Sequence, residues 1–243
     1  MSKYNHVISL GYFCSPALEL ERIGLRDASY PFDWIICDFK GVLDCIENKF
    51  DDFLKYENIY QYKDYKQYYI DQKYNFHFYH DFSAYGAIKN QLPSVLQKYQ
   101  RRIERFRLNI KEPTLFLRYI ESQKELDYIE ANYENIISVL KAENENNDLI
   151  LISNDDVQSE LLFVYKVKKD KNDSVARRFL DKNAELKNYL CSDIYDTDKR
   201  LANIENYKSK KNKEMVFKYT NYAISKINKL IKKPYIHSSI IDN

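Results

Sequence analysis

The sequence predicts an α/β fold, a single domain in which helices flank a central and largely parallel sheet. Residues 114–119 (TLFLRY) and 148–153 (DLILIS) have the pattern of buried strands, and a long helical pattern over 124–142 separates them. Strand, long helix and strand in this order are typical of parallel strands joined by helical crossovers. Composition agrees, because 44% of the 243 residues are hydrophobic and can form a substantial core.

The chain is expected to begin with a strand, a short turn and a helix. The strand covers residues 6–10 (HVISL) and ends at Gly11. Ser15 followed by Pro16 is typical of a helix start, with a hydroxyl cap and a proline at the first helical position. Gly24 is expected to end this helix, since glycine is the usual residue just past a helix end.

Three further segments are predicted before residue 114. A helix over 38–54 has apolar residues recurring on one side. Residues 56–85 are rich in tyrosine and are expected to form strands or long ordered loops. A helix over 93–110 places apolar side chains inside and its arginines outside.

The C-terminal part is predicted to add one strand and a basic helical tail. The strand covers 161–167. Residues 201–243 hold nine lysines and three acids, with helical spacing over 215–231. We expect this tail to dock on the domain, and contact with an acidic partner is the alternative. No internal repeat or clear linker is visible, so residues 1–243 are predicted to be one domain.

Composition excludes several functional classes. The four glycines are too far apart for a phosphate-binding loop or a dinucleotide-binding motif. A net charge of +2 argues against a nucleic-acid-binding protein. No apolar run approaches the ~18 residues of a membrane span, and the N-terminal residues lack the pattern of a signal peptide. We therefore expect a cytoplasmic protein without a transmembrane segment.

Cys14 is the candidate nucleophile. It follows the first strand and lies just before the predicted helix start, where free N–H groups and the helix dipole favour thiolate and can hold an oxyanion. A nucleophile on a strand-to-helix turn is common in acyl-transfer enzymes. The alternative is a small residue at a close helix–strand contact. Cys37, Cys45 and Cys191 form no C-x-x-C pair and are expected to be free, buried thiols.

A cysteine nucleophile needs a base, and the chain has four histidines. His6 lies within the first strand and His237 in the tail, which leaves His77 and His80. In an extended segment these two point to opposite faces, so one site can use only one of them. We favour His80, where the aromatic segment is expected to leave its strand; a hydrogen-bonded structural histidine is the alternative. A metal site at His77, His80 and Asp81 would need a bent strand, and no metal is predicted.

Three acids are candidates to orient the base. Asp33 is flanked by apolar and aromatic residues and is the one we assign, as a third catalytic residue; a turn residue is its alternative role. Asp155 follows a predicted strand, where α/β sheets place functional groups, and could equally cap a helix. Asp81 is adjacent to His80 and would point away from it in a strand. The pattern does not separate these acids.

Residues 7 to 120 resemble an uncharacterised bacterial family of papain-like cysteine peptidases. Order and spacing agree for S-L-G-x-x-C-x-x-A-x-x-L, L-R, S-x-P-F-D-W, H-D-F, Y-x-R-R-I-x-R-F and L-F-L-R. These motifs are carried by Ser9, Leu10, Gly11, Cys14, Ala17, Leu20, Leu25, Arg26, Ser29, Pro31, Phe32, Asp33, Trp34, His80, Asp81, Phe82, Tyr99, Arg101, Arg102, Ile103, Arg105, Phe106, Leu115, Phe116, Leu117 and Arg118.

The resemblance implies a catalytic pair of Cys14 and His80, with no cofactor needed for hydrolysis. Two features depart from papain itself. Residues 1–13 contain no glutamine for a papain-type oxyanion hole. The predicted sheet is parallel, whereas that of papain is antiparallel.

The chain is similar, more loosely, to capsule-biosynthesis acetyltransferases that bind coenzyme A. In such an enzyme Arg102 and Arg118, together with Arg101 and Arg105, could bind phosphates or an acidic sugar. For the three arginines at 101–105, a solvated helix face is the alternative.

Three hypotheses follow. The first is a thiol-dependent hydrolase of an amide or ester, acting on a small molecule, a peptide or a saccharide. The second is a coenzyme-A-dependent O-acetyltransferase for a surface polysaccharide. The third is a non-catalytic module that binds a sugar or protein through the aromatic residues of 56–85.

Overall fold

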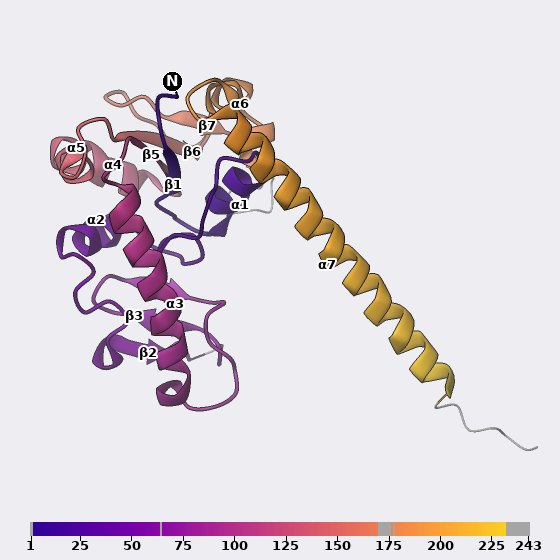
Figure 1. The fold of residues 1–243 in the computed structure, drawn as a ribbon. Helices are drawn as coiled ribbons and strands as arrows, with labels where there is room; N and C mark the ends of the chain where they lie inside the picture. Colours follow the sequence, from indigo (N-terminus) through magenta and orange to yellow (C-terminus); the bar gives the residue numbers. More distant parts are fainter. Residues whose placement is uncertain (1, 64, 170–175, 177, 232–243) are drawn as a thin grey trace, which may run out of the picture.

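A computed structural model describes residues 2–63, 65–169, 176 and 178–231, without the side chains of 216, 217 and 219–231 (Figure 1). Its central sheet has four strands, all parallel, in the order β1-β5-β6-β7. Helices flank this sheet, so the predicted α/β class is confirmed. The strands are β1 (His6–Ser9), β5 (Thr114–Ile120), β6 (Asp148–Asn154) and β7 (Tyr165–Val167).

A second, antiparallel sheet lies beside the lower half of helix α3 in Figure 1. It is built from the tyrosine-rich segment, which forms short strands joined by ordered loops as predicted. The segment opens with a 3-10 turn at Tyr56–Asn58. The strands are β2 (Ile59–Gln61), β3 (Tyr69–Asp71) and β4 (Phe76–Phe78).

Seven α-helices are described, and a 3-10 turn (Phe179–Asp181) precedes α6. The α-helices are α1 (Cys14–Arg22), α2 (Phe39–Glu47), α3 (Ile88–Asn109), α4 (Gln123–Ala131), α5 (Tyr133–Lys141), α6 (Ala184–Cys191) and α7 (Thr197–Ile231).

Several predicted boundaries are wrong. The first helix begins at Cys14 and not after Ser15, with Phe13 at the N-cap and no side-chain cap, and Pro16 is tolerated because it lies in the first turn. The helix predicted over 38–54 ends at Glu47, before four residues with positive φ. The single helix predicted over 124–142 is two helices that meet at Asn132.

Two apolar cores cover the two faces of the parallel sheet. Strand β5 is buried along its whole length, because its side chains alternate between these cores. The larger core lies toward α2, α3, α4 and α5 and continues to the antiparallel sheet. The smaller core includes side chains of α1 and α6. The sheet therefore holds the carboxyl end of β1 between two packed layers.

Helix α7 leaves the body of the molecule after its first turns, as Figure 1 shows. Its base packs against Gly24, which lies two residues beyond the end of α1 and has a φ of +80°. A Cβ atom at this position would lie 2.3 Å from the carbonyl oxygen of Arg200 and 2.7 Å from a side-chain carbon of Ile204. Among the described residues, no helix is both long enough and apolar enough to cross a membrane.

We expect Gly24→Ala to destabilise the protein more than Gly86→Ala does. Both glycines have a positive φ, at +80° and +87°, so the backbone strain of about 1–2 kcal/mol is shared. A Cβ at Gly86 meets only a flexible amide 3.9 Å away, whereas at Gly24 it meets the backbone of α7. Urea unfolding measures the difference, and limited proteolysis should show faster cleavage within α7 for Gly24→Ala alone. Equal losses would contradict close packing of α7 on α1.

Candidate active site at Cys14

Cys14 is the first residue of α1, five residues beyond the end of β1, and its side chain is half-buried. The turn after the first strand therefore leads directly to Cys14, which begins the helix and does not precede it as predicted. The start of a helix leaves N–H groups without partners. Here Phe13 contributes no side-chain cap and Pro16 has no N–H, so the first N–H groups are those of Cys14, which bonds its own thiol, and of Ser15. Two donors thus lie next to the thiol.

Burial raises the pKa of the Cys14 thiol, and a hydrogen bond from its own backbone N–H opposes this effect only in part. The sequence-based expectation of a lowered pKa is wrong for the free chain. The reason is desolvation of the half-buried thiol, which no cationic side chain among the described residues offsets. A reactive thiolate at Cys14 therefore needs a base that takes its proton.

The loop before Cys14 is held by a buried arginine, Arg118 of β5. One terminal nitrogen of Arg118 donates to the Leu10 carbonyl at 2.8 Å, and the other donates to the Cys37 carbonyl at 2.7 Å. Its Nε donates to Glu125 at 2.9 Å, and the guanidinium packs over the Phe39 ring. Arg118 thus ties the end of β1 to the segment that leads into α2.

Gly11 allows this loop to pass close to the 32–37 segment. Its φ is +84°, and an added Cβ would lie 2.7 Å from the Cys37 sulfur and 3.3 Å from the Phe32 carbonyl oxygen. The Cys37 N–H donates to the Tyr12 carbonyl at 3.1 Å. The backbone immediately before Cys14 is therefore fixed from both sides, which is the preorganisation that a nucleophile requires.

His80, the predicted base, is exposed and lies just beyond β4. Its ring contacts that of Tyr79, with the centroids 5.1 Å apart. This contact belongs to a cluster that also includes Tyr62, Tyr65 and Tyr68, whose rings touch one another. Among the described residues, no hydrogen bond joins the Cys14 thiol to His80, so the pair remains a prediction.

His77, the second candidate, lies on β4 and is half-buried. Burial lowers the pKa of its imidazole. The Tyr68 hydroxyl and Nδ1 of His77 are 2.7 Å apart, and the Asn75 amide oxygen lies 3.1 Å from Nε2. The backbone of His77 pairs with Ile36, next to Cys37. The element that carries both histidines is therefore linked, through residues 36 and 37, to the loop before Cys14.

None of the three candidate acids contacts an imidazole in the part of the chain that the structure describes. Asp33 is fully buried, and one of its oxygens accepts from Arg26 at 2.7 Å and from the Tyr30 N–H at 2.8 Å. Burial raises the pKa of the Asp33 carboxyl, and the Arg26 guanidinium opposes this. Asp81 accepts from Lys98 and from the Tyr99 hydroxyl. Asp155 is exposed.

The arginines predicted to bind a cofactor have different surroundings. The donors of the fully buried Arg118 are directed at Glu125 and backbone carbonyls, which favours a structural role. Arg102 is half-buried, lies over the Tyr99 ring at 4.9 Å, and keeps one buried terminal nitrogen without a partner among the described residues. Arg105 donates to the Ser29 carbonyl at 2.7 Å, and Arg101 is exposed.

The sequence of residues 5–152 matches a family described as "Putative papain-like cysteine peptidase (DUF1796)", which is more than half of the chain. The chain belongs to this family. The matched region contains Cys14, Asp33, His80 and Arg118 and ends within β6, so β7, α6 and α7 lie outside it.

One relative of this family member is the "Uncharacterized protein R408" of Acanthamoeba polyphaga mimivirus. It is 37% identical over 60 residues, which are 24% of this chain and 27% of that protein. The likeness thus spans a small part of either protein. No solved structure gives a significant match.

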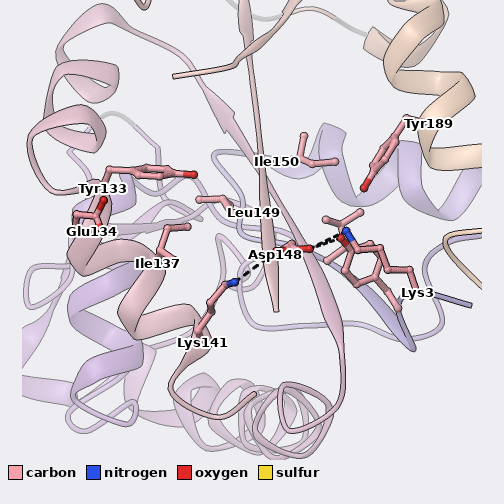
Figure 2. Close-up of a pocket in the computed structure, with 11 residues that line it drawn as sticks. Lys3, Tyr133, Glu134, Ile137, Lys141, Asp148, Leu149, Ile150 and Tyr189 are labelled. Atoms are coloured by element: carbon pink, nitrogen blue, oxygen red, sulfur yellow. Dashed lines mark hydrogen bonds and ion pairs between the residues drawn. The ribbon is translucent and has the colours of Figure 1, made fainter. Parts of the chain in front are cut away.

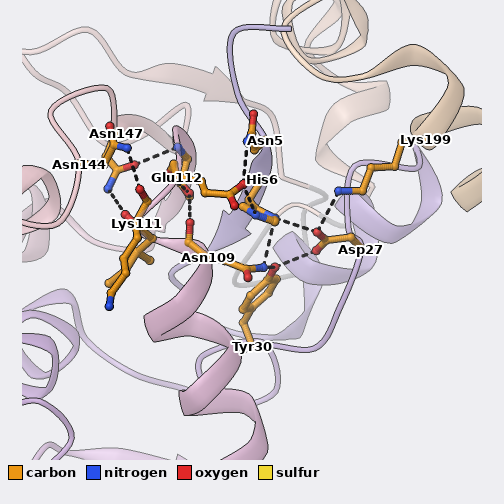
Figure 3. A network of polar contacts seen from close by, with 12 residues as sticks. Asn5, His6, Asp27, Tyr30, Asn109, Lys111, Glu112, Asn144, Asn147 and Lys199 are labelled. Atoms are coloured by element: carbon orange, nitrogen blue, oxygen red, sulfur yellow. Dashed lines mark hydrogen bonds and ion pairs between the residues drawn. The ribbon is translucent and has the colours of Figure 1, made fainter.

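The structure contains a histidine–carboxylate pair, His6 and Asp27, that was not predicted from the sequence. His6 Nδ1 lies 2.9 Å from Asp27, and Figure 3 shows Asn109 and Glu112 on the same imidazole. Asp27 also accepts from the Tyr30 hydroxyl at 2.8 Å. Because His6 starts β1, the ring lies about 16 Å from the turn that follows the strand. This network joins β1, α3 and α7 and does not serve Cys14.

The network predicts a pH dependence of stability through Asp27. Burial raises the pKa of its carboxyl, but hydrogen bonds from His6 and Tyr30 outweigh burial and lower it overall. A lowered folded-state pKa stabilises the fold above the unfolded value of about 3.9, and this contribution is lost as the pH falls below it. Asp27→Asn should therefore flatten the loss of stability between about pH 4 and pH 2, measured by urea unfolding. Asp155→Asn, at an exposed site, should keep the wild-type slope. Equal slopes in the wild type and both variants would show that Asp27 does not cause this pH dependence.

The structure does not bring His77, His80 and Asp81 together as a metal-binding group. Among the residues that it describes, no three metal-ligating side chains form a group. Asp81, which the sequence placed beside the two histidines, is instead paired with Lys98.

Proposed function

We propose that this chain is a cysteine-dependent acyl-transfer enzyme that hydrolyses an amide or ester, with Cys14 as the nucleophile. The observation that carries the proposal is the position of Cys14 at the first residue of α1, beside N–H groups without a cap, on a loop fixed by Arg118. Membership of a papain-like family supports the same chemistry.

The proposed reaction needs one proton shuttle and one oxyanion site. A histidine takes the thiol proton, and the Cys14 sulfur attacks the carbonyl carbon of the substrate. The N–H groups of Cys14 and Ser15 donate to the oxyanion of the tetrahedral intermediate. The intermediate collapses to a thioester as the histidine returns the proton to the leaving amine or alcohol. Water, deprotonated by the same histidine, then hydrolyses the thioester and restores the thiol.

His80 is the proposed base. It lies two residues beyond β4, which pairs through His77 with the segment next to the Cys14 loop. Its imidazole is exposed and so is accessible to a substrate. The hydrogen bonds of His77 to Tyr68 and Asn75 instead hold that ring in place.

A coenzyme-A-dependent O-acetyltransferase is the second candidate. The observation that favours it is Arg102, whose buried terminal nitrogen has no partner among the described residues and could meet a phosphate oxygen. Arg118, by contrast, already donates to Glu125 and to the carbonyls of Leu10 and Cys37. The measurement is the melting temperature with coenzyme A, because a ligand at ~100 times its Kd adds about 2.7 kcal/mol. No shift, or an equal shift in Arg102→Met, would contradict this candidate.

The hydrolase proposal is tested by trapping the thioester. The protein is mixed with p-nitrophenyl acetate, quenched with acid, and digested for mass spectrometry. We expect acetyl on Cys14 and not on Cys191, which is the matched control because both thiols are half-buried. Acetylation of the two cysteines at equal rates, or of neither, would contradict a nucleophilic role.

A further inference from the structure

The sheet edge at β6 is open over its first four residues. Strand β5 pairs with β6 from Asp148 to Ser153, but β7 on the other side pairs only from Ile152 onward. Residues 148–151 therefore have a partner strand on one side and none among the described residues on the other. Strand edges of this kind bind further strands through their backbone groups.

The open side carries free backbone groups. The Asp155 N–H donates to Val167 of β7 at 3.2 Å, so odd-numbered residues of β6 direct their backbone toward β7. The same alternation places the N–H and C=O of Leu149 and the N–H of Leu151 on that side. No hydrogen bond within the described part of the chain occupies the Leu149 groups.

Two adjoining cavities follow this edge, with volumes of about 390 Å³ and 310 Å³. They share Tyr133, Leu149, Ile150 and Tyr189 in their linings. Figure 2 shows Tyr133 and Tyr189 on opposite sides of β6, each with its hydroxyl turned toward the strand. The result is a groove with β6 as its floor and the helices α5 and α6 as its walls.

The groove has an apolar mouth at one end and charges at the other. Phe163 lines it and is 69% exposed, with its ring against that of Tyr165. At the far end, Asp148 forms ion pairs with Lys3 at 3.0 Å and with Lys141 at 3.8 Å. Glu134 also lines this end, so two lysines face two acids and the lining carries no net charge that would favour a charged ligand.

We propose that this groove binds an extended, uncharged peptide segment of a partner protein, which adds a strand beside residues 148–151 of β6. Four residues of strand span about 13 Å, so the segment is short. Its alternate side chains meet Leu149 and Tyr133 on one face and Ile150 and Tyr189 on the other. Both faces are apolar, so the segment is a run of β-branched or other apolar residues.

A second copy of this chain fits less well. Two sheet edges can pair only where both protrude, and here β6 lies recessed between α5 and α6. A single strand can enter this recess, whereas the edge of another recessed sheet cannot. The proposal does not depend on acyl transfer at Cys14, because the groove lies at the amino end of β6 and Cys14 follows the carboxyl end of β1.

The test selects binders from a phage-displayed library of random dodecapeptides against the whole chain. Selected peptides should share an uncharged apolar run, and their Kd should rise at least tenfold in Phe163→Asp. Leu161→Asp is the matched control, since Leu161 is 78% exposed and lines neither cavity. Its Kd should stay within twofold of wild type.

A second measurement locates the bound peptide. Amide hydrogen exchange at Leu149 and Leu151 should slow at least tenfold when the selected peptide binds. Selection that yields no binder, or binders that tolerate Phe163→Asp and leave these two amides unprotected, would overturn the proposal. If sedimentation shows that the wild-type chain is a dimer and that Phe163→Asp is a monomer, the groove binds a second copy of this chain and the proposal is overturned.

Discussion

Arg118→Met should lower the free energy of unfolding by about 3–5 kcal/mol. The fully buried guanidinium of Arg118 pairs with Glu125, whose side chain is only 9% exposed, and donates to the carbonyls of Leu10 and Cys37. Methionine restores much of the volume, but the Glu125 carboxylate loses its buried counter-ion and the carbonyls of Leu10 and Cys37 lose the Arg118 donors. Urea unfolding, followed by far-UV circular dichroism, measures the loss.

Two variants make this result specific. Arg101→Met removes an exposed arginine on α3 and should change stability by about 0.5 kcal/mol or less. Arg118→Met combined with Glu125→Leu should recover part of the loss, because no buried charge then remains. A loss below about 1 kcal/mol in Arg118→Met alone would show that this arginine does not hold the loop.

Cys14→Ala should reduce the hydrolysis of p-nitrophenyl acetate at least about 10³-fold, since a missing nucleophile removes the covalent route and leaves only binding and the oxyanion site. Cys191→Ala should keep the wild-type rate. Release of p-nitrophenolate measures both. Circular dichroism checks that Cys14→Ala is folded, and a folded variant with unchanged turnover would exclude Cys14 as the nucleophile.

The local pattern of the sequence predicted most of the fold, because apolar residues recur with one spacing in helices and another in strands. The parallel strands predicted at 114–119 and 148–153 are confirmed, and the first strand is found at His6–Ser9, one residue shorter than the predicted 6–10. Errors arose where the backbone changes direction without a proline or a typical cap. Asn132 interrupts the helix predicted over 124–142 in this way.

The surroundings of the site were less predictable, because they depend on contacts between distant residues. Arg118 looked like an anion ligand, yet its partners come from residues 10, 37 and 125. The sequence shows His6 only as a strand residue, because the acid that pairs with it lies 21 residues away. The sequence favours Asp33 as the acid that orients a histidine, whereas in the structure Asp33 accepts from Arg26. The position of Cys14 could be predicted because strand, glycine and helix start are adjacent in the chain.

The central claim is that Cys14 is a nucleophile activated by His80, and the pH dependence of its alkylation by iodoacetamide tests this most directly. Peptide mass spectrometry follows each cysteine in the wild type and in His80→Ala. We predict that wild-type Cys14 reacts faster than Cys191 at neutral pH, because His80 takes the thiol proton. Cys14 in His80→Ala should react only at alkaline pH, because burial raises the pKa of the thiol. Identical profiles in the two proteins would contradict the pair.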